Sequence, residues 1–245
     1  MFKFITGIVV AFVSFNTLSA PMLKPLQFEE VTTNIFLVKS FREFKNLKSP
    51  DNPIIIDANS LIYIDGKDAY LIDTPWNAEN MPQLMTWIEN RDLTLKKTVF
   101  THFHEDQTGG LEYLQEHGFD TYATKLTNTL LVKDNKKAAN HELDAQESVL
   151  LDNKIEVFYP GPGHSKDNSV VWFPKEKVLL GGCLMRANEV NTIGWTGDAD
   201  LAKWAQSAKN VLIKYPETKL VIPGHGDIGK GTSVISHTVN IAESL

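Results

Sequence analysis

The chain has 245 residues, which is the size of one domain with a sizeable hydrophobic core. Hydrophobic residues make up 42% of it and charged residues 22%, a composition typical of a globular protein in water. The formal net charge of −6 argues against a nucleic-acid-binding protein, because such proteins normally carry a basic face. A single cysteine excludes an intramolecular disulfide.

The first 20 residues have the pattern of a secretory signal peptide. A single lysine, Lys3, precedes an almost wholly apolar run over 4–15, and small residues follow it. The run is too short for a transmembrane helix, and no cysteine near it could carry a lipid, so we expect export without a stable membrane anchor. A buried N-terminal helix is the alternative. We divide the chain into a signal peptide over 1–20, whose cleavage position Pro21 leaves open, and a single domain over 21–245.

Strands dominate the first third of the domain. Runs of β-branched and aromatic residues predict strands at 34–38, 54–56, 60–64 and 69–72. The middle two are either separate strands or one interrupted strand. The polar, basic segment 40–52 predicts a loop or hairpin, and Asp65-Gly66 predicts a tight turn.

Helices and strands then alternate. Helical spacing of apolar residues predicts helices over 77–91, 109–118, 125–133 and 200–214, and from about 232. Apolar runs predict strands at 97–100, 121–123, 154–159, 169–173, 177–180 and 219–222. The charged segment 134–147 is expected to be irregular. The order, strand-rich and then alternating, occurs twice over, which predicts an α/β fold with helices flanking two packed sheets.

Three metal-capable side chains occur at alternate positions directly after the strand predicted at 97–100. They are His102, His104 and Asp106. A loop that follows a strand can turn all three toward one point. Two imidazoles and a carboxylate are nitrogen and oxygen ligands that suit zinc. We expect the neighbouring Glu105 and Gln107 to point away from the metal.

Three further candidates follow apolar runs of strand length and lie beside or near glycine, which lets the backbone approach a metal closely. They are His164 in a Gly/Pro turn, Cys183 after two glycines, and His225 between two glycines. A free thiol is a liability in an exported protein, and metal ligation would protect Cys183 as a thiolate. The alternative for Cys183 is a small buried apolar side chain, and each histidine taken singly is more often structural.

The six residues predict two adjacent zinc sites. His102, His104 and His164 would form the first, and Asp106, Cys183 and His225 the second. Three protein ligands leave a coordination position open for water, which is the catalytic rather than the structural zinc pattern. Zinc lowers the pKa of bound water from about 16 to roughly 7, which provides a hydroxide nucleophile at neutral pH.

Several motifs together make the chain similar to the metallo-β-lactamases of class B, first subclass, in which a cysteine belongs to the second zinc site. The motifs are Asp73-Thr-Pro-Trp76, His102-Phe-His104-Glu-Asp106, Pro162-Gly-His164-Ser-Lys-Asp-Asn168, Gly181-Gly-Cys183-Leu-Met-Arg186, Gly197-Asp-Ala199 and Pro223-Gly-His225-Gly226. The resemblance extends from about Phe28 to the C-terminus.

This resemblance implies an αβ/βα four-layer sandwich, with two central sheets flanked by helices and two zinc ions in a groove at one edge of the sheets. It implies a periplasmic enzyme that hydrolyses the β-lactam amide bond of penicillins, cephalosporins and carbapenems, and so confers antibiotic resistance. Asp106 would be the catalytic residue that orients the attacking hydroxide, in addition to binding the second zinc. We also expect a monomer.

Two residues depart from the family pattern. The usual lysine three residues after the cysteine is Arg186, whose guanidinium fork would bind the substrate carboxylate. Trp195 stands where the family often has asparagine, so we expect an apolar wall rather than help to the carbonyl oxygen. The alternatives are a solvated charge for Arg186 and core packing for Trp195. In the family the region of 40–52 folds over the substrate, and Phe41 or Phe44 could provide the apolar contact.

Two other functions compete with this interpretation. One is a different hydrolase of the same superfold, such as a thioesterase of the glyoxalase II kind, which typically has a histidine after the motif aspartate and an aspartate bridging the metals. Gln107 follows Asp106 here, and Cys183 stands in the region of that aspartate, so both features argue against it. The other is an exported zinc-binding protein without catalytic activity.

Overall fold

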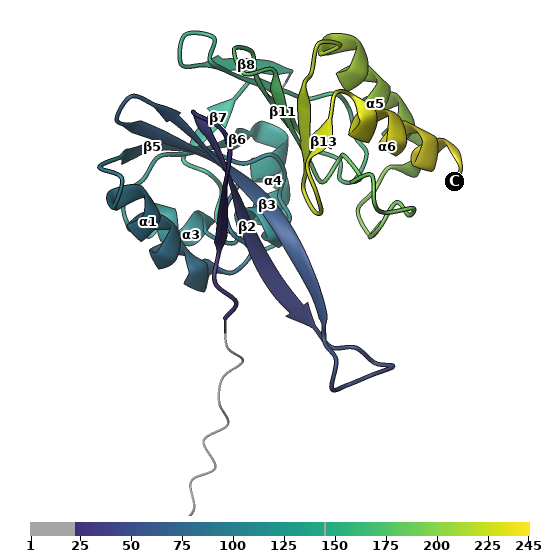
Figure 1. Ribbon diagram of the computed structural model, residues 1–245, viewed down its shortest axis with the longest axis horizontal. Coiled ribbons are helices and arrows are strands. Elements are labelled where there is room, and N and C mark those ends of the chain that lie inside the picture. The colour runs from purple at the N-terminus through teal and green to yellow at the C-terminus, as the bar shows by residue number, and fades with distance from the viewer. Residues whose placement is uncertain (1–22, 145) are drawn as a thin grey trace, which may run out of the picture.

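A computed structural model of the protein describes residues 23–144 and 146–245. The predicted signal peptide over 1–20 lies outside the described residues. Two β-sheets pack face to face, and helices cover the outer face of each sheet (Figure 1). Within the described part of the chain, no helix combines the length and the apolar character that crossing a membrane requires.

The first sheet has seven strands in sequence order. They are β1 (Gln27–Thr32), β2 (Ile35–Phe44), β3 (Ile54–Asp65), β4 (Asp68–Ile72), β5 (Thr94–Val99), β6 (Thr121–Thr124) and β7 (His141–Leu143). The first four pair antiparallel, and β4 to β7 pair parallel. The parallel strands therefore deliver the loops that follow them to one edge of the sheet.

The second sheet has six strands in the order β13-β12-β11-β10-β9-β8. They are β8 (Glu147–Leu150), β9 (Ile155–Phe158), β10 (Val170–Phe173), β11 (Val178–Gly182), β12 (Leu220–Pro223) and β13 (Gly229–Lys230). The pair β11 and β12 is parallel, and the other pairs are antiparallel. Since β11 and β12 run in the same direction, the residues that follow them reach the same edge.

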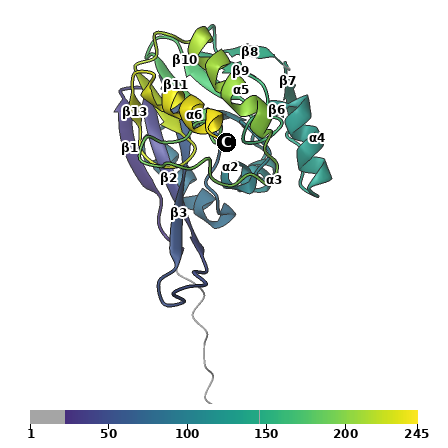
Figure 2. The same ribbon diagram turned by 90° about the vertical axis from the view of Figure 1, so that its right-hand side faces the viewer.

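Helices complete the outer layers. The helix η1 (Ala78–Asn80), α1 (Met81–Glu89), α2 (Glu105–Thr108), α3 (Leu111–Glu116) and α4 (Lys125–Lys133) belong to the first half, and α5 (Leu201–Lys214) and α6 (Ser233–Glu243) to the second. In Figures 1 and 2 the helices α5 and α6 cover the second sheet, on the far side from the first sheet.

Three hydrophobic layers hold this arrangement together, and neighbouring residues of one strand enter different layers. Ile62 packs with α1, α3 and α4, whereas Leu61 packs between the two sheets. Likewise Leu180 packs between the sheets, whereas Leu179 packs against α5 and α6. Successive side chains on a strand point to opposite faces, so these strands are apolar on both faces. The four-layer αβ/βα sandwich expected from the resemblance is confirmed.

The structure decides between the local alternatives and corrects other local predictions. The segment 54–65 is one continuous strand, and the segment 40–52 is the far part of a hairpin in which β2 and β3 stay in register out to Phe44 and Ile54. The hairpin projects beyond the body of the molecule (Figures 1 and 2). The segment 134–147 was expected to be irregular, which is wrong for β7. That strand has three residues and no apolar run, so pairing with β6 rather than local sequence creates it.

Candidate metal centre

The loop that carries the first motif is anchored by a buried carboxylate. Asp73, which follows β4 with a φ of 61°, accepts hydrogen bonds from the backbone N of Thr101 at 2.7 Å and from its Oγ1 at 2.8 Å. Burial raises the pKa of Asp73 to about 8, whereas the two Thr101 donors favour the ionised form. The anchor fixes the residue directly before His102.

The same hydroxyl determines which nitrogen of His102 is free. Thr101 Oγ1 has one hydrogen and donates it to Asp73, so it accepts from His102 Nδ1, which lies 3.3 Å away. Nε2 of His102 then carries a lone pair. This atom is buried and has no hydrogen-bond partner among the described residues. A buried nitrogen that lacks a partner but has an available lone pair fits a metal ligand.

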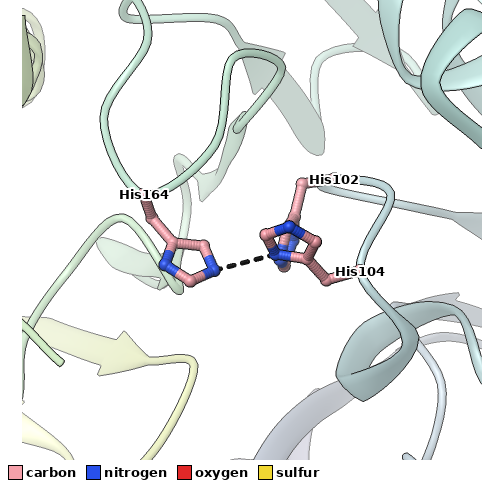
Figure 3. A group of neighbouring side chains, drawn as sticks. All are labelled: His102, His104 and His164. Carbon is pink, nitrogen blue, oxygen red and sulfur yellow. Dashed lines mark hydrogen bonds between the residues drawn. The ribbon is translucent and has the colours of Figure 1, made fainter. Parts of the chain in front are cut away.

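His102, His104 and His164 form the first cluster (Figure 3). Their ligand atoms all lie within 4.8 Å of one another, and His104 Nδ1 is 3.0 Å from His164 Nε2. The other nitrogen of His104 pairs with Asp198 Oδ2 at 3.0 Å, which orients the ring. Burial and the neighbouring histidines lower the pKa of His102 well below its usual value and that of His164 to about 3. These two imidazoles are therefore neutral, as metal ligands must be.

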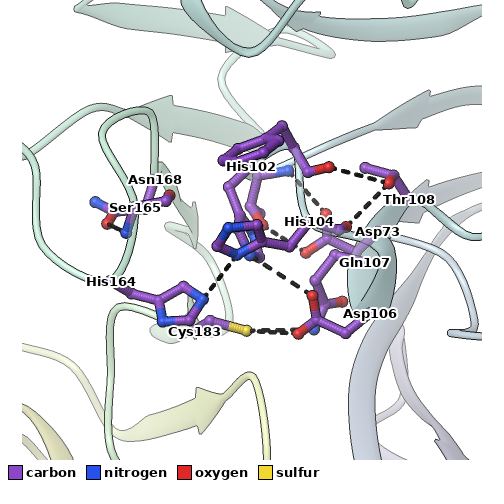
Figure 4. Close-up of polar contacts among 12 residues, drawn as sticks. Asp73, His102, His104, Asp106, Gln107, Thr108, His164, Ser165, Asn168 and Cys183 are labelled. Carbon is purple, nitrogen blue, oxygen red and sulfur yellow. Dashed lines mark hydrogen bonds and ion pairs between the residues drawn. The ribbon is translucent and has the colours of Figure 1, made fainter. Parts of the chain in front are cut away.

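Asp106, Cys183 and His225 form the second cluster, part of which Figure 4 shows. Asp106 Oδ2 lies 3.0 Å from His225 Nε2 and 3.1 Å from Cys183 Sγ, and the sulfur lies 3.4 Å from the same nitrogen of His225. His225 Nδ1 donates to the backbone O of Asp57 at 2.5 Å, which leaves Nε2 facing the cluster. The ligand atoms of His102, Asp106 and Cys183 also lie within 4.8 Å of one another, so the two clusters adjoin.

The protonation of the second cluster depends on mutual contacts. Burial alone would raise the pKa of Asp106, but His225 and His102 lower it far below its usual value. Burial would lower the pKa of His225, and Asp106 more than offsets this effect. Burial and the nearby Asp106 raise the pKa of the Cys183 thiol. A bound divalent cation would instead favour the thiolate form of Cys183, because a coordinating thiol is deprotonated.

Two neighbours of Cys183 shape its position. A side chain at Gly224 would place its Cβ 2.4 Å from Cys183 Sγ, so only glycine allows the loop after β12 to lie this close. Gln107 Nε2 donates to the same sulfur at 3.7 Å. The expectation that Gln107 points away from the metal site is therefore wrong. One turn of helix places Gln107 and Asp106 on the side of Cys183, which alternation along an extended loop did not suggest.

A cavity of about 740 Å³ lies over the clusters. The hairpin and the segment after β4 contribute Arg42, Phe44, Ile56 and Trp76 to one side of it. The loop after Cys183 contributes Arg186, Glu189, Val190, Gly194 and Trp195 to the other. Of the two aromatic residues expected near substrate, Phe44 lines this groove, whereas Phe41 is buried. Sequence analysis missed Trp76 as a wall residue, although its motif was noted.

Arg186 and Trp195 both face this groove. Arg186 Nε donates to the backbone O of Thr192 at 3.1 Å, which ties the guanidinium to the loop that it lies under. Burial lowers the pKa of Arg186. Trp195 is 58% exposed, which excludes core packing, and its ring centroid lies 5.0 Å from that of His104. An apolar surface therefore stands directly beside the first cluster.

Comparison with known proteins gives a consistent result. The profile of the metallo-beta-lactamase superfamily matches residues 56–225. A metallo-beta-lactamase type 2 of Pseudomonas aeruginosa is 38% identical over 220 residues, which cover 90% of this chain and 86% of that protein. Among solved structures, the DIM-1 metallo-beta-lactamase exposed to ceftazidime is 40% identical with a TM-score of 0.85, covering 91% of this chain and 99% of that one. The FIM-1 enzyme from Pseudomonas aeruginosa in its mono-zinc form is 30% identical with a TM-score of 0.84, covering 91% and 97%.

Proposed function

The chain belongs to the metallo-beta-lactamase superfamily, and from this membership we propose that it hydrolyses the amide bond of β-lactam antibiotics. The observation that carries the proposal is the pair of adjoining clusters of ligand side chains beneath a groove of substrate size. One set has three imidazoles, and the other has a carboxylate, a thiol and an imidazole. Two sets of three ligands suit a catalytic rather than a structural metal centre. Hydrolysis of penicillins, cephalosporins and carbapenems would confer resistance to them.

Zinc is the metal that the donor atoms fit. His102, His104 and His164 would hold one ion through neutral imidazole nitrogens, and Asp106, Cys183 and His225 would hold a second. The buried Nε2 of His102, which makes no hydrogen bond among the described residues, supports the first assignment. When bound, zinc supplies a water of near-neutral pKa and a Lewis acid for the charge that develops as the ring opens.

The side chains around the clusters supply orientation. Asp106, whose carboxylate lies between the two clusters, would accept a hydrogen bond from the attacking water and so orient it toward the β-lactam carbonyl. Asp73 and Thr101 keep His102 in the tautomer that presents Nε2. Asp198 fixes the tautomer of His104 in the same way, because it accepts a hydrogen bond from Nε2 and leaves the lone pair of Nδ1 facing the cluster.

Arg186 and Trp195 place the substrate. Since Arg186 Nε is used by Thr192, the two terminal nitrogens remain for the carboxylate that β-lactams carry next to the reacting ring. Trp195 on one side and Phe44 with Trp76 on the other offer apolar walls to the ring substituents. Aromatic walls of this kind bury apolar surface without fixing one substituent, which suits several β-lactam classes.

The cellular setting is part of the same proposal. The N-terminal pattern of one lysine, an apolar run and small residues supports export to the periplasm, where β-lactams meet their targets. There the protein would act as a monomer on a small-molecule substrate, without a nucleic-acid partner. Zinc binding would protect its only thiol, Cys183, from oxidation.

The test is hydrolysis of nitrocefin and imipenem by the purified mature protein, before and after removal of metal with a chelator and re-addition of zinc. We expect both activities to disappear with the metal and to return with zinc. A folded, zinc-loaded sample that hydrolyses neither compound would contradict the proposal. Activity on a thioester in such a sample would then indicate a thioesterase, and no activity at all a zinc-binding protein.

A further inference from the structure

Arg42 and Glu105 join two segments that lie 63 residues apart in the sequence. Arg42 belongs to the projecting part of β2, and Glu105 is the first residue of α2. Nη1 of the guanidinium donates to Oε2 of the carboxylate at 2.5 Å, and Nη2 donates to Oε1 at 3.1 Å. Two parallel bonds fix the orientation of both groups as well as their distance. Below, this pair is called the brace.

Glu105 lies between two candidate metal ligands in the chain, so the brace can affect the position of both. Its two neighbours are His104 of the first cluster and Asp106 of the second. The Glu105 side chain belongs to neither cluster, and both of its oxygens accept hydrogen bonds from Arg42 instead. A restraint on Glu105 therefore acts on the two peptide units that carry His104 and Asp106.

The guanidinium of Arg42 makes a further contact on the groove side. It lies 5.3 Å from the ring of Trp76, which in turn lies 5.4 Å from Phe44 and 5.9 Å from His225. Trp76 is itself held, since its backbone N donates to Ser40 Oγ of β2. Arg42 therefore contacts Trp76 of the aromatic wall, and Trp76 in turn contacts the hairpin residue Phe44 and His225 of the second cluster.

We propose that the brace is a positioning device that couples the β2–β3 hairpin to both metal clusters. This inference rests on the proposed function in one respect, namely that the clusters bind zinc. Coupling between two sites is reciprocal, so an intact hairpin tightens zinc binding, and bound zinc steadies the hairpin. The hairpin beside the groove is then less mobile when zinc is bound to the clusters.

The exposure of the two groups sets the size of the effect. The side chain of Arg42 is 32% exposed and that of Glu105 is 51% exposed, so water screens the pair. Partly exposed ion pairs contribute modest coupling, and breaking the brace is expected to weaken zinc binding by about two- to fivefold. The loss should shrink at high salt, because screening already weakens the pair in the intact protein.

Arg42→Ala and Glu105→Ala each remove the brace from a different side. In metal-free protein, followed by amide hydrogen exchange, we expect Arg42→Ala to raise exchange in the metal loop over 101–108. Glu105→Ala should raise exchange in the hairpin over 43–55. Arg91→Ala is the matched control, because Arg91 also stacks on a tryptophan, Trp87 at 3.7 Å, but lies outside the groove. It should raise exchange in neither segment.

Zinc affinity, measured by competition with a chromophoric chelator, provides the second readout. The double variant should bind zinc as weakly as either single variant, because each already removes the whole interaction. Arg42→Lys keeps the charge but lacks the fork, and it should fall between wild type and Arg42→Ala. It also serves if Arg42→Ala fails to fold.

The two proposals fail in different ways. Exchange that changes only next to each substitution, or losses of zinc affinity that add in the double variant, would overturn the brace even if the protein hydrolyses β-lactams. A wild-type protein that binds no zinc would overturn the proposed function and the part of the inference that concerns metal. The exchange experiment would then still decide whether the hairpin and the metal loop are coupled.

Discussion

The two clusters of candidate ligands differ in the chemistry of their ligand atoms, in their burial and in the hydrogen bonds that hold them. The first consists of three imidazoles, of which His102 is fully buried and is held by a chain of hydrogen bonds through Thr101 to Asp73. The second combines a carboxylate, a thiol and an imidazole, and the side chain of His225 is 23% exposed. The first cluster is ready to accept a cation, whereas the second must release a thiol proton to do so. We therefore expect the first cluster to be filled before the second.

The largest effect should follow from the loss of a first-cluster ligand. His102→Ala removes the most buried nitrogen, and we expect kcat/KM for imipenem to fall by at least about a thousandfold, since an unfilled first site leaves no oriented nucleophile. His141→Ala is the control, because His141 pairs with Asp120 at the surface. Comparable activity of the two variants would mean that the first cluster does not hold the catalytic metal.

A smaller loss should follow from Cys183→Ser, which keeps the size of the side chain but removes the thiolate ligand. We expect a folded protein with the first ion bound and kcat/KM reduced by about ten- to a hundredfold. Thermal unfolding checks the fold, and elemental analysis checks the metal content. Full activity with two zinc ions still present would remove Cys183 from the ligand set.

Asp73→Asn tests the support of the first cluster without touching a ligand. The amide can accept from Thr101 N but would donate to Thr101 Oγ1, so the hydroxyl proton would turn toward His102 Nδ1 and move the ring proton to Nε2. Support of this kind is typically worth about ten- to a hundredfold in metal affinity. Zinc titration should show this loss, with Asp92→Asn, at an exposed residue, as the control. Unchanged affinity would show that the tautomer of His102 is set in another way.

The smallest effect should come from Arg186→Ala, which leaves both clusters intact. We expect KM for carboxylate-bearing β-lactams to rise about tenfold and kcat to fall less, because Arg186 binds a group that does not react. Steady-state kinetics measures both constants, and Arg91→Ala provides the arginine control. An unchanged KM would remove Arg186 from the substrate site.

Local sequence was sufficient to predict the elements that have a clear pattern of apolar residues. The helix α4 begins at Lys125 and ends at Lys133, as the spacing of its apolar residues predicts, and the hydroxyl of Thr124 caps it. The edge strands β1 and β13 were missed, because β1 is largely exposed and β13 has only two residues. Such strands depend on a partner that sequence periodicity does not reveal.

The candidate ligands come together for a different reason, namely that each follows a strand that ends at the same edge of the fold. The side chains around them could not be predicted. Gln107 was assigned to the wrong side because α2 was not predicted, and nothing in the sequence connects Arg42 to Glu105. Contacts between distant segments follow from the packing of the two sheets and the path of the hairpin, which local patterns do not contain.

The most direct test of the account is the number of zinc ions per chain, measured by native mass spectrometry as metal-free protein is titrated with zinc. We predict one ion and then a second in the wild-type protein, and a single ion in Cys183→Ser over the same range. A wild-type chain that never binds more than one ion, or a Cys183→Ser variant that still binds two, would contradict the assignment of two separate clusters.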